Sequence, residues 1–545
     1  MNLIGNINAI PFRRFRGGGG VAPFPSIPGM IARYSASGIT NEQMAANPVW
    51  VDKTGNGYDL QLKNFSWKGM SGVGGYVADI DEWGTNSTAA YFERNSIKIT
   101  ATFKENASLG LLYHNIKLRQ SCVLKVTGIP EGCDAFLDDR LGNRFYMSED
   151  GVYEIIPSNF LAEALYLSIE KYPERWYGSK LTIEQLPLYP GALVFDGVDD
   201  YGVYDNFPIL TKEKGYTVVA LRQWITYNPN AISAIATNAS DRSFNGAFTF
   251  ENYNKGAEQT ISYGATQISL QYTKSPFSWQ TTSKYNGFNI ANGNKDATNS
   301  LVLGKSYPQR NDFANFAIWE LVFLDHDATE EELTKIKDYF VKTYPWLFPD
   351  QAWTVVGKTN EDEDRATIAN ITGNGNNLVC LNLGFIEGSG YNEEGEYAGY
   401  LVTDGVDDKI TSSTFEMGND WTVIGDWELI NTGKKDNAGI VKFDSIVIYN
   451  YNPILINIKN GRNNLIPDQN TVNAICSDGR IYSKDWKEFI YNEETESTSK
   501  NLLTIGYSGN SYTKIAFKNL AIYPTVLSKE DCIKAYNYLQ TLKAK

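Results

Sequence analysis

Short runs of alternating apolar and polar residues fill most of the chain and predict β-strands. The runs are rich in valine, isoleucine, tyrosine, phenylalanine and tryptophan, and Asn-Gly, Asp-Gly or Gly-Asn turns separate them. Two segments have the spacing of an amphipathic helix instead. One is expected over about residues 329–343, where Thr329 and Glu332 suit a capping box, and the other begins near Ser528. The pattern predicts an all-β protein with two helices.

An internal repeat organises these strands. Residues 191–207 (GALVFDGVDDYGVYDNF) recur as residues 399–415 (GYLVTDGVDDKITSSTF), so that Asp404 follows Asp196 by 208 residues. Three further blocks repeat at nearly the same offset, and each copy ends in one of the predicted helices. We interpret the repeat as two related β-sandwiches, each with a helix as a lid on its end.

The first copy contains an insertion. Residues 51–62 match residues 369–380 at an offset of 318, which exceeds the other offset of 208 by 110 residues. The expected domains are therefore an arm and linker over 1–30, a first sandwich over 31–75 plus 189–346, an inserted β-sandwich over 76–188, and a second sandwich over 350–545.

The repeated motifs resemble a known fold family. The sequence D-x-T-G-N-G, the FDGVDDY turn, the YTV strand and the closing helix look like concanavalin A-like jelly rolls, with laminin-G-like lectin modules nearest. The insert resembles small carbohydrate-binding sandwiches. The ensemble, including residues 59–76, is similar to virion surface and fibre proteins of phages infecting gut Bacteroides, crAss-like phages among them. This resemblance implies synthesis in the host cytoplasm, and the N-terminus shows no secretory signal pattern.

Charge and composition exclude several functions. The net charge of −14 argues against nucleic acid as the main ligand, because phosphate binding needs a basic face. No apolar run is long enough to span a membrane. The five cysteines lack metal-ligand spacing, so we expect buried thiols rather than disulfides or a metal site. Two histidines leave little room for a His-based catalytic centre.

Catalysis is not expected. Jelly-roll glucanases carry two carboxylates on one strand in the pattern E-x-D-x-x-E, and this spacing is missing from the sequence. A polysaccharide depolymerase stays as the alternative from the enzyme class. The acidic run of residues 361–364 is interpreted as a solvated loop.

The Asp-Gly-Val-Asp-Asp turns admit two interpretations. The aspartates can cap backbone amides of a tight turn, which is the interpretation we favour. Alternatively, carboxylates beside such a turn can bind Ca²⁺, as the resemblance to laminin-G-like modules implies. The calcium ligands would be Asp199, Asp200, Asp407 and Asp408.

Aromatic side chains in loop-like surroundings are candidates for stacking on sugar rings. Most of the aromatic residues must belong to the cores of the sandwiches. The glycan-binding candidates are Trp67, Trp83, Trp176, Tyr177 and Trp279.

The N-terminal arm differs from the rest of the chain. Residues 1–30 carry three arginines and no acid, so the remainder has a net charge of −17. The arm interleaves aromatic and basic side chains and continues into four glycines and then prolines, which suits a binding peptide on a tether. The anchoring residues would be Phe12, Arg13, Arg14, Phe15 and Arg16.

Together these features predict a non-enzymatic phage virion protein. Its arm would dock on capsid or other virion proteins, and its sandwiches would contact glycans of the host surface or of mucus. A head fibre or capsid decoration is expected, with a tail fibre as the alternative, and a homotrimer is the usual state of such fibres. A purely structural spacer that binds no sugar is the remaining alternative.

Overall fold

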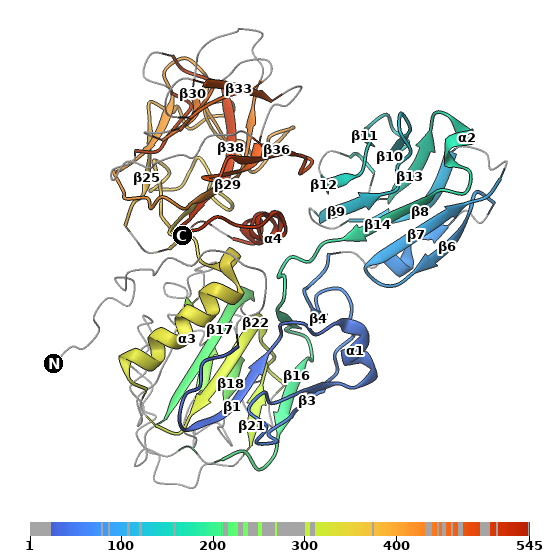
Figure 1. The fold of residues 1–545 in the computed structure, drawn as a ribbon. Helices are drawn as coiled ribbons and strands as arrows, with labels where there is room; N and C mark the ends of the chain where they lie inside the picture. The colour runs from blue at the N-terminus through green and yellow to red at the C-terminus, as the bar shows by residue number, and fades with distance from the viewer. Residues whose placement is uncertain are drawn as a thin grey trace.

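The computed structural model describes residues 23–545 with internal gaps. The residues it leaves undescribed, besides 1–22, are 78–79, 86–87, 106–109, 119–121, 156–159, 163, 209, 211–215, 227–232, 238–248, 253–267, 270–299, 306–310, 327, 373–374, 431–438, 444–445, 450–453, 459–461, 467–471, 491–501, 508–510, 543 and 545. The described chain is all-β, as predicted, with antiparallel sheets stacked in pairs (Figure 1).

The first sandwich consists of two six-stranded sheets. One sheet has the order β20 (Ile268–Ser269), β17 (Thr217–Thr226), β22 (Asn315–Leu324), β15 (Leu193–Asp196) and β4 (Gly72–Val73), and β1 (Met30–Ser35) also pairs with β22. The other has the order β19 (Thr249–Asn252), β18 (Ser233–Thr237), β21 (Leu301–Leu303), β16 (Tyr201–Tyr204), β3 (Leu60–Lys63) and β2 (Val49–Trp50).

The second sandwich repeats this plan with two eight-stranded sheets. One has the order β26 (Gly390–Tyr391), β27 (Leu401–Val402), β38 (Ile515–Tyr523), β29 (Thr422–Leu429), β34 (Val472–Cys476), β35 (Arg480–Ser483) and β36 (Glu488–Ile490), with β23 (Gln351–Thr354) also on β38. The other has the order β24 (Thr367–Ile368), β25 (Leu378–Leu381), β28 (Lys409–Ser412), β37 (Thr504–Ile505), β30 (Gly439–Phe443), β31 (Ile446–Tyr449), β32 (Ile454–Ile458) and β33 (Arg462–Ile466).

The inserted sandwich forms two five-stranded sheets of its own, within the interval 76–188 that the repeat offsets delimit. The first has the order β11 (Arg144–Met147), β10 (Asp134–Asp138), β13 (Ala164–Glu170), β8 (Gly110–Lys117) and β5 (Gly84–Thr85). The second has the order β12 (Gly151–Ile155), β9 (Cys122–Thr127), β14 (Lys180–Gln185), β7 (Lys98–Phe103) and β6 (Ala90–Arg94). Ile99, Ala101 and Phe103 alternate inward on β7, as the apolar pattern predicts.

Both predicted helices are present. Helix α3 (Glu330–Thr343) begins after the capping box of Thr329 and Glu332, and α4 (Lys529–Leu539) begins after Ser528, whose side chain accepts a hydrogen bond from the backbone of Asp531. The shorter helical segments are α1 (Asn41–Ala46), α2 (Pro173–Trp176), η2 (Ile80–Glu82) and η6 (Pro345–Leu347). None of the described helices is both long and apolar enough to cross a membrane. All five cysteines are buried free thiols, which confirms that prediction.

The predicted role of the two helices as end lids is incomplete for α4, which packs on β29 and β38 of its own sandwich but also contacts the other two. This helix lies where the second sandwich meets the other two (Figure 1). The ring of Tyr538 packs edge-to-face on Trp319 of the first sandwich, at 6.1 Å between centroids. Tyr536 donates a hydrogen bond of 2.9 Å to Glu154 of the insert. The helix is therefore a shared structural element of three sandwiches, because each of them buries one of its side chains.

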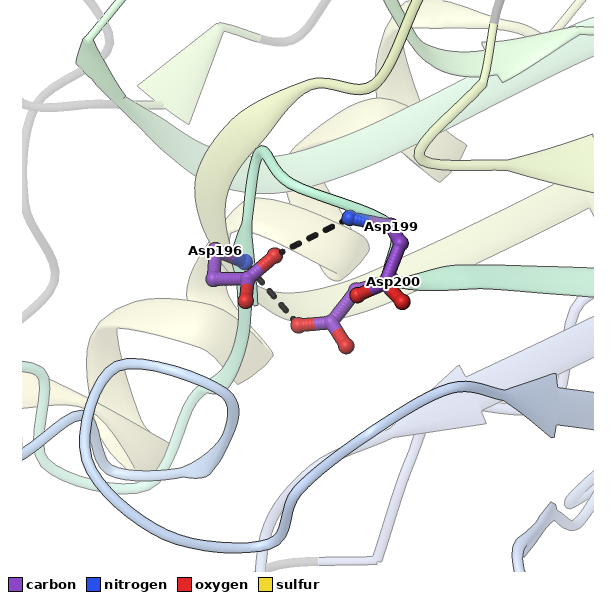
Figure 2. Close-up of side chains that lie close together, drawn as sticks. All are labelled: Asp196, Asp199 and Asp200. Atoms are coloured by element: carbon purple, nitrogen blue, oxygen red, sulfur yellow. Dashed lines mark hydrogen bonds between the residues drawn. The ribbon is translucent and has the colours of Figure 1, made fainter. Parts of the chain in front are cut away.

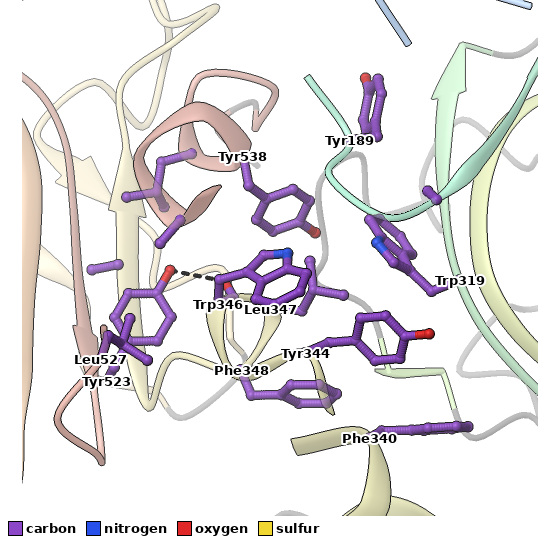
Figure 3. Packing of buried hydrophobic residues seen from close by; sticks show 14 of the residues in the cluster. Tyr189, Trp319, Phe340, Tyr344, Trp346, Leu347, Phe348, Tyr523, Leu527 and Tyr538 are labelled. Atoms are coloured by element: carbon purple, nitrogen blue, oxygen red, sulfur yellow. Dashed lines mark hydrogen bonds between the residues drawn. The ribbon is translucent and has the colours of Figure 1, made fainter. Parts of the chain in front are cut away.

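A continuous aromatic core fills this junction (Figure 3). Its members include Tyr189, Trp319, Phe340, Tyr344, Trp346, Leu347, Phe348, Tyr523, Leu527 and Tyr538. Tyr523 of β38 donates a hydrogen bond of 3.0 Å to the carbonyl of Trp346, in the short segment that joins the two copies. Because the linking segment is itself buried, the two copies pack as one unit and not as beads on a flexible string.

The junction between insert and second sandwich also contains a buried ionic cluster. Lys518 of β38 lies 3.3 Å from Asp426 and 3.7 Å from Glu154 of β12. Tyr400 donates a hydrogen bond of 3.0 Å to Asp426. Burial raises the pKa of Glu154. Burial opposes the charge of Lys518, yet the two carboxylates leave its pKa above the ordinary value. The insert is therefore held to the second sandwich by charges as well as by apolar contacts.

The arm and linker are shorter than predicted. The ring of Phe24 packs on the ring of Tyr339 in α3, with 4.8 Å between the ring centroids. The guanidinium of Arg33 lies 4.2 Å from the centroid of the Phe24 ring. Arg33 in turn forms a two-pronged ion pair with the buried Glu320. Ile27 is buried in the junction core. Residues 23–29 thus belong to the first sandwich, because their apolar side chains find a surface there.

Candidate functional site

The acidic turns were one candidate site, and Figure 2 shows the first of them. Asp196 accepts hydrogen bonds from the backbone amides of Val198 and Asp199, at 2.8 and 3.4 Å. Asp200 accepts one from the amide of Asp196 at 3.0 Å and another from the hydroxyl of Ser71 at 2.9 Å. The carboxylates therefore organise the turn, as the favoured interpretation predicts.

The second copy repeats this arrangement residue for residue. Asp404 caps Val406 and Asp407, and Asp408 accepts hydrogen bonds from the amide of Asp404 and the hydroxyl of Ser389, both at 2.8 Å. Burial raises the pKa of Asp408. Burial also raises the pKa of Asp200, to about 7. Both groups are therefore less acidic than an ordinary aspartate.

The same carboxylates could hold a cation, since in each turn three ligand oxygens lie within 4.8 Å of one another. The donor set fits calcium poorly. Ca²⁺ takes six to eight oxygens, whereas the buried aspartates Asp200 and Asp408 already accept hydrogen bonds, and Asp199 and Asp407 are exposed. The hydrogen bonds hold both turns without an ion, although Oδ1 of Asp408 is buried with no hydrogen-bond partner among the described residues. Calcium binding stays a prediction.

The aromatic candidates have different surroundings from those expected. Trp83 and Trp176 are core residues of the insert, with 3% and 1% of their surface exposed. Neither has a free ring face for a sugar, so the sequence-based proposal is wrong for both. Trp67 is half-buried and stacks on Phe65 at 4.7 Å. Tyr177 is also half-buried, and Trp279 lies outside the described residues, as do Phe12, Arg13, Arg14, Phe15 and Arg16.

Sequence reasoning missed a surface of the second sandwich that we call the acidic rim. It comprises residues 359–365, residues 379–389 and the turn 404–408. Asn360 exchanges two hydrogen bonds of 2.8 Å with the backbone of Tyr391, next to the second segment. The Arg365 guanidinium lies 5.3 Å from the ring centroid of Phe385. Asn382 donates a hydrogen bond of 3.0 Å to the carbonyl of Asp407. These contacts unite three segments in one surface.

The acidic rim combines negative charge with exposed apolar side chains. Its exposed acids include Glu361, Glu363, Glu387 and Asp407. Leu381 and Ile386 are 36% and 64% exposed. The run of residues 361–364, interpreted from the sequence as a solvated loop, is thus part of a larger surface. The pairwise comparison of the two copies could have revealed it, because the first copy has Lys63 and Lys68 where the second has Leu381 and Ile386.

Comparisons with known proteins leave the family of the chain open. No family model matches it, and no curated protein matches it in sequence. Among solved structures, a Trypanosoma rangeli sialidase matches 43% of the chain and 41% of its own length, at 8% identity and a TM-score of 0.27. The same sialidase in complex with sialic acid matches 83% of both chains at 8% identity, also with a TM-score of 0.27.

A botulinum neurotoxin serotype D binding domain covers 92% of the chain and 98% of its own length, at 9% identity and a TM-score of 0.15. In the first sialidase alignment the chain spans about two fifths of the length of its relative. Alignments this weak carry no information about function.

Proposed function

We propose that the chain is a structural protein of a phage virion surface, a head fibre or capsid decoration that acts without catalysis. Its N-terminal arm would dock on capsid or other virion proteins, and its three sandwiches would face outward toward glycans of the host or of mucus. A homotrimer is the expected assembly.

The observation that carries this proposal is the contrast between the arm and the body. The arm is basic and aromatic, with Phe12, Arg13, Arg14, Phe15 and Arg16 before four glycines. The body is acidic, and its three sandwiches share the aromatic core of the junction. Phe24 packs on Tyr339 and so fixes the point at which the arm leaves the body. A rigid body that carries one tethered docking peptide suits attachment to a larger particle.

Deletion of residues 1–20 tests the proposal. The truncated chain is expected to fold normally, because the deletion ends before Phe24 and Ile27, but to be missing from assembled particles. Particles would be purified from cells that supply either form and compared by quantitative mass spectrometry. Normal incorporation of the truncated chain would refute the docking role of the arm.

The alternatives require separate measurements. A depolymerase would release reducing ends from laminarin or capsular glycans on prolonged incubation, and sustained release would overturn the non-enzymatic assignment. A glycan array on the intact protein distinguishes a glycan-binding fibre from a spacer that binds no sugar. Of the original aromatic candidates, Trp67 and Tyr177 keep partly exposed rings in the described part of the chain and would be substituted first.

A further inference from the structure

The duplication provides a control for judging the acidic rim, because the same surface exists on both copies. In each copy the first strand of the rim has the same alternation, with two buried and two exposed residues: β3 exposes Gln61 and Lys63, and β25 exposes Val379 and Leu381. Lys68 and Ile386 also correspond, since each forms a bridge with the equivalent serine, Ser71 or Ser389. The fold therefore accepts polar side chains at positions where the second copy has apolar ones.

Exposed apolar side chains that the fold does not require indicate a contact surface. Val379, Leu381 and Ile386 are 40%, 36% and 64% exposed. The same segments of the rim expose the acids Glu361, Glu363 and Glu387. A partner for this surface must supply positive charge together with apolar side chains, and arginine and aromatic residues do so best at interfaces.

The N-terminal arm has this chemistry. Residues 12–16 alternate two phenylalanines with three arginines, and arginine forms two-pronged contacts with carboxylates. The first 30 residues contain no acid that would weaken the attraction. Charge and hydrophobicity thus match between the arm and the acidic rim.

The arm of the same molecule would have to be almost fully extended to reach the turn 404–408 of its own rim, which costs conformational entropy. Arg16 is seven residues before Pro23, which permits a span of about 25 Å at full extension. The turn 404–408 of the rim lies beside Lys514, which precedes β38, as the close approach of Gly405 to Lys514 shows. The opposite end of β38, at Tyr523, contacts the junction core. A strand of nine residues is about 27 Å long, and the first sandwich lies beyond it.

We propose that the acidic rim binds residues 12–16 of a second copy of this chain. The inference rests on the docking role proposed above for the arm and names its partner. Each chain would then carry one arm and one receptor surface, so that copies join head to tail on the particle. Such a heterologous contact closes into a ring when the rotation between neighbours permits.

Binding of a synthetic peptide tests the inference directly. The receptor would be the full-length chain with R13A, R14A and R16A, which removes the basic charge of its own arm and leaves the rim unchanged. A fluorescently labelled peptide of residues 8–20 would be titrated with this receptor and followed by anisotropy. Saturable binding that weakens with added salt is expected, because charge pairs contribute to it.

Three sets of variants in the receptor locate the site. L381K with I386K grafts the residues of the first copy onto the rim, and E361Q with E363Q and E387Q removes three exposed charges. Each set should weaken binding by about tenfold or more, as the loss of roughly 1.4 kcal/mol implies. E93Q with E105Q and E174Q changes the same number of exposed acids on the insert and should leave the affinity unchanged.

The outcomes separate this inference from the proposed function. Equal binding by the graft variant and its parent, or no binding at all, would overturn the rim as the receptor. If residues 1–20 are nonetheless needed for incorporation into particles, the arm docks on a different virion protein and the proposed function stands. If the peptide binds the rim but the truncated chain is incorporated normally, the proposed function fails while the rim contact holds.

Discussion

Lys518 provides the sharpest test of how the insert is held to the second sandwich. Its ammonium group lies between Asp426 and Glu154, at 3.3 and 3.7 Å. The side chain is 15% exposed, and both carboxylates are 9% exposed. Substitution by methionine keeps the length of the side chain but leaves two buried carboxylates without their cation. Removal of one partner from a buried ion pair costs about 3–5 kcal/mol, and we expect about 3 kcal/mol here because of the partial exposure.

A matched control is available in the same region. Lys484 pairs with Glu428 at 3.0 Å, and its charge also acts on Asp426 and Glu154, but its side chain is 56% exposed. Exposed pairs contribute about 0.5 kcal/mol, so K484M should have a small effect. A triple variant, K518M with E154Q and D426N, removes all three charges together. It should recover most of the stability, because the large cost comes from unpaired buried charge and not from the lost attraction alone.

Two measurements check this prediction. Urea unfolding followed by tryptophan fluorescence gives the change in stability, and hydrogen exchange at β12 and α4 shows whether the insert detaches. K518M should unfold at lower urea concentration and exchange faster at both elements. If K518M behaves like K484M, or if the triple variant is as unstable as K518M, the cluster does not hold the insert in the way described.

Two further predictions concern the first sandwich. Burial raises the pKa of Asp200 from 3.8 to about 7, so folding favours the protonated form of this side chain. The resulting contribution to the free energy of unfolding is complete below pH 3.8, the ordinary pKa. It is lost as the pH rises through 7. D200N should flatten this part of the profile of urea midpoint against pH, because asparagine does not titrate. The turn should survive, since the amide oxygen can still accept from the backbone of Asp196 and the amide group can donate to Ser71. An unchanged pH dependence would contradict the assignment. F24A removes the ring that packs on Tyr339 and Arg33 and should cost about 2 kcal/mol locally. Limited proteolysis should then cut residues 23–29 faster, with the rest of the first sandwich unaffected; cleavage equal to the parent would show that the contact does not anchor the arm.

The periodic and repeated parts of the sequence predicted the fold well. Strand alternation and turn residues are local signals, and the capping box at Thr329 and Glu332 occurs where the sequence places it. The two repeat offsets, 318 before the insertion and 208 after it, predicted the inserted domain. Residues gained by one copy change the sequence distance between matching blocks on either side of the insertion. These inferences needed no knowledge of contacts between distant segments.

Burial of individual aromatic side chains could not be predicted in the same way. Trp83 follows a turn-like stretch and Trp176 lies in a short polar helix, and both nevertheless fill the core of the insert. Helix α4 shows the same limit. Its apolar stripe predicted one buried face, but Cys532, Ala535 and Tyr538 are also buried. Cys532 lies beside Cys476 of its own sandwich, and Tyr538 packs on Trp319 of the first sandwich. Whether a side chain meets solvent or a neighbouring domain depends on contacts between segments hundreds of residues apart.

Comparison of the two copies separates what the fold needs from what each copy does. The turn aspartates Asp200 and Asp408 and their serine partners are the same in both copies, because the backbone of the turn depends on them. The exposed positions of the rim differ in charge and polarity although the backbone around them is alike. A side chain that changes between copies at constant geometry is free of the folding constraint, and the contact proposed above would account for its apolar character in the second copy. By this argument the exposed apolar residues of the acidic rim, which replace Lys63 and Lys68 of the first copy, are the part of this surface that the fold leaves open to selection for binding.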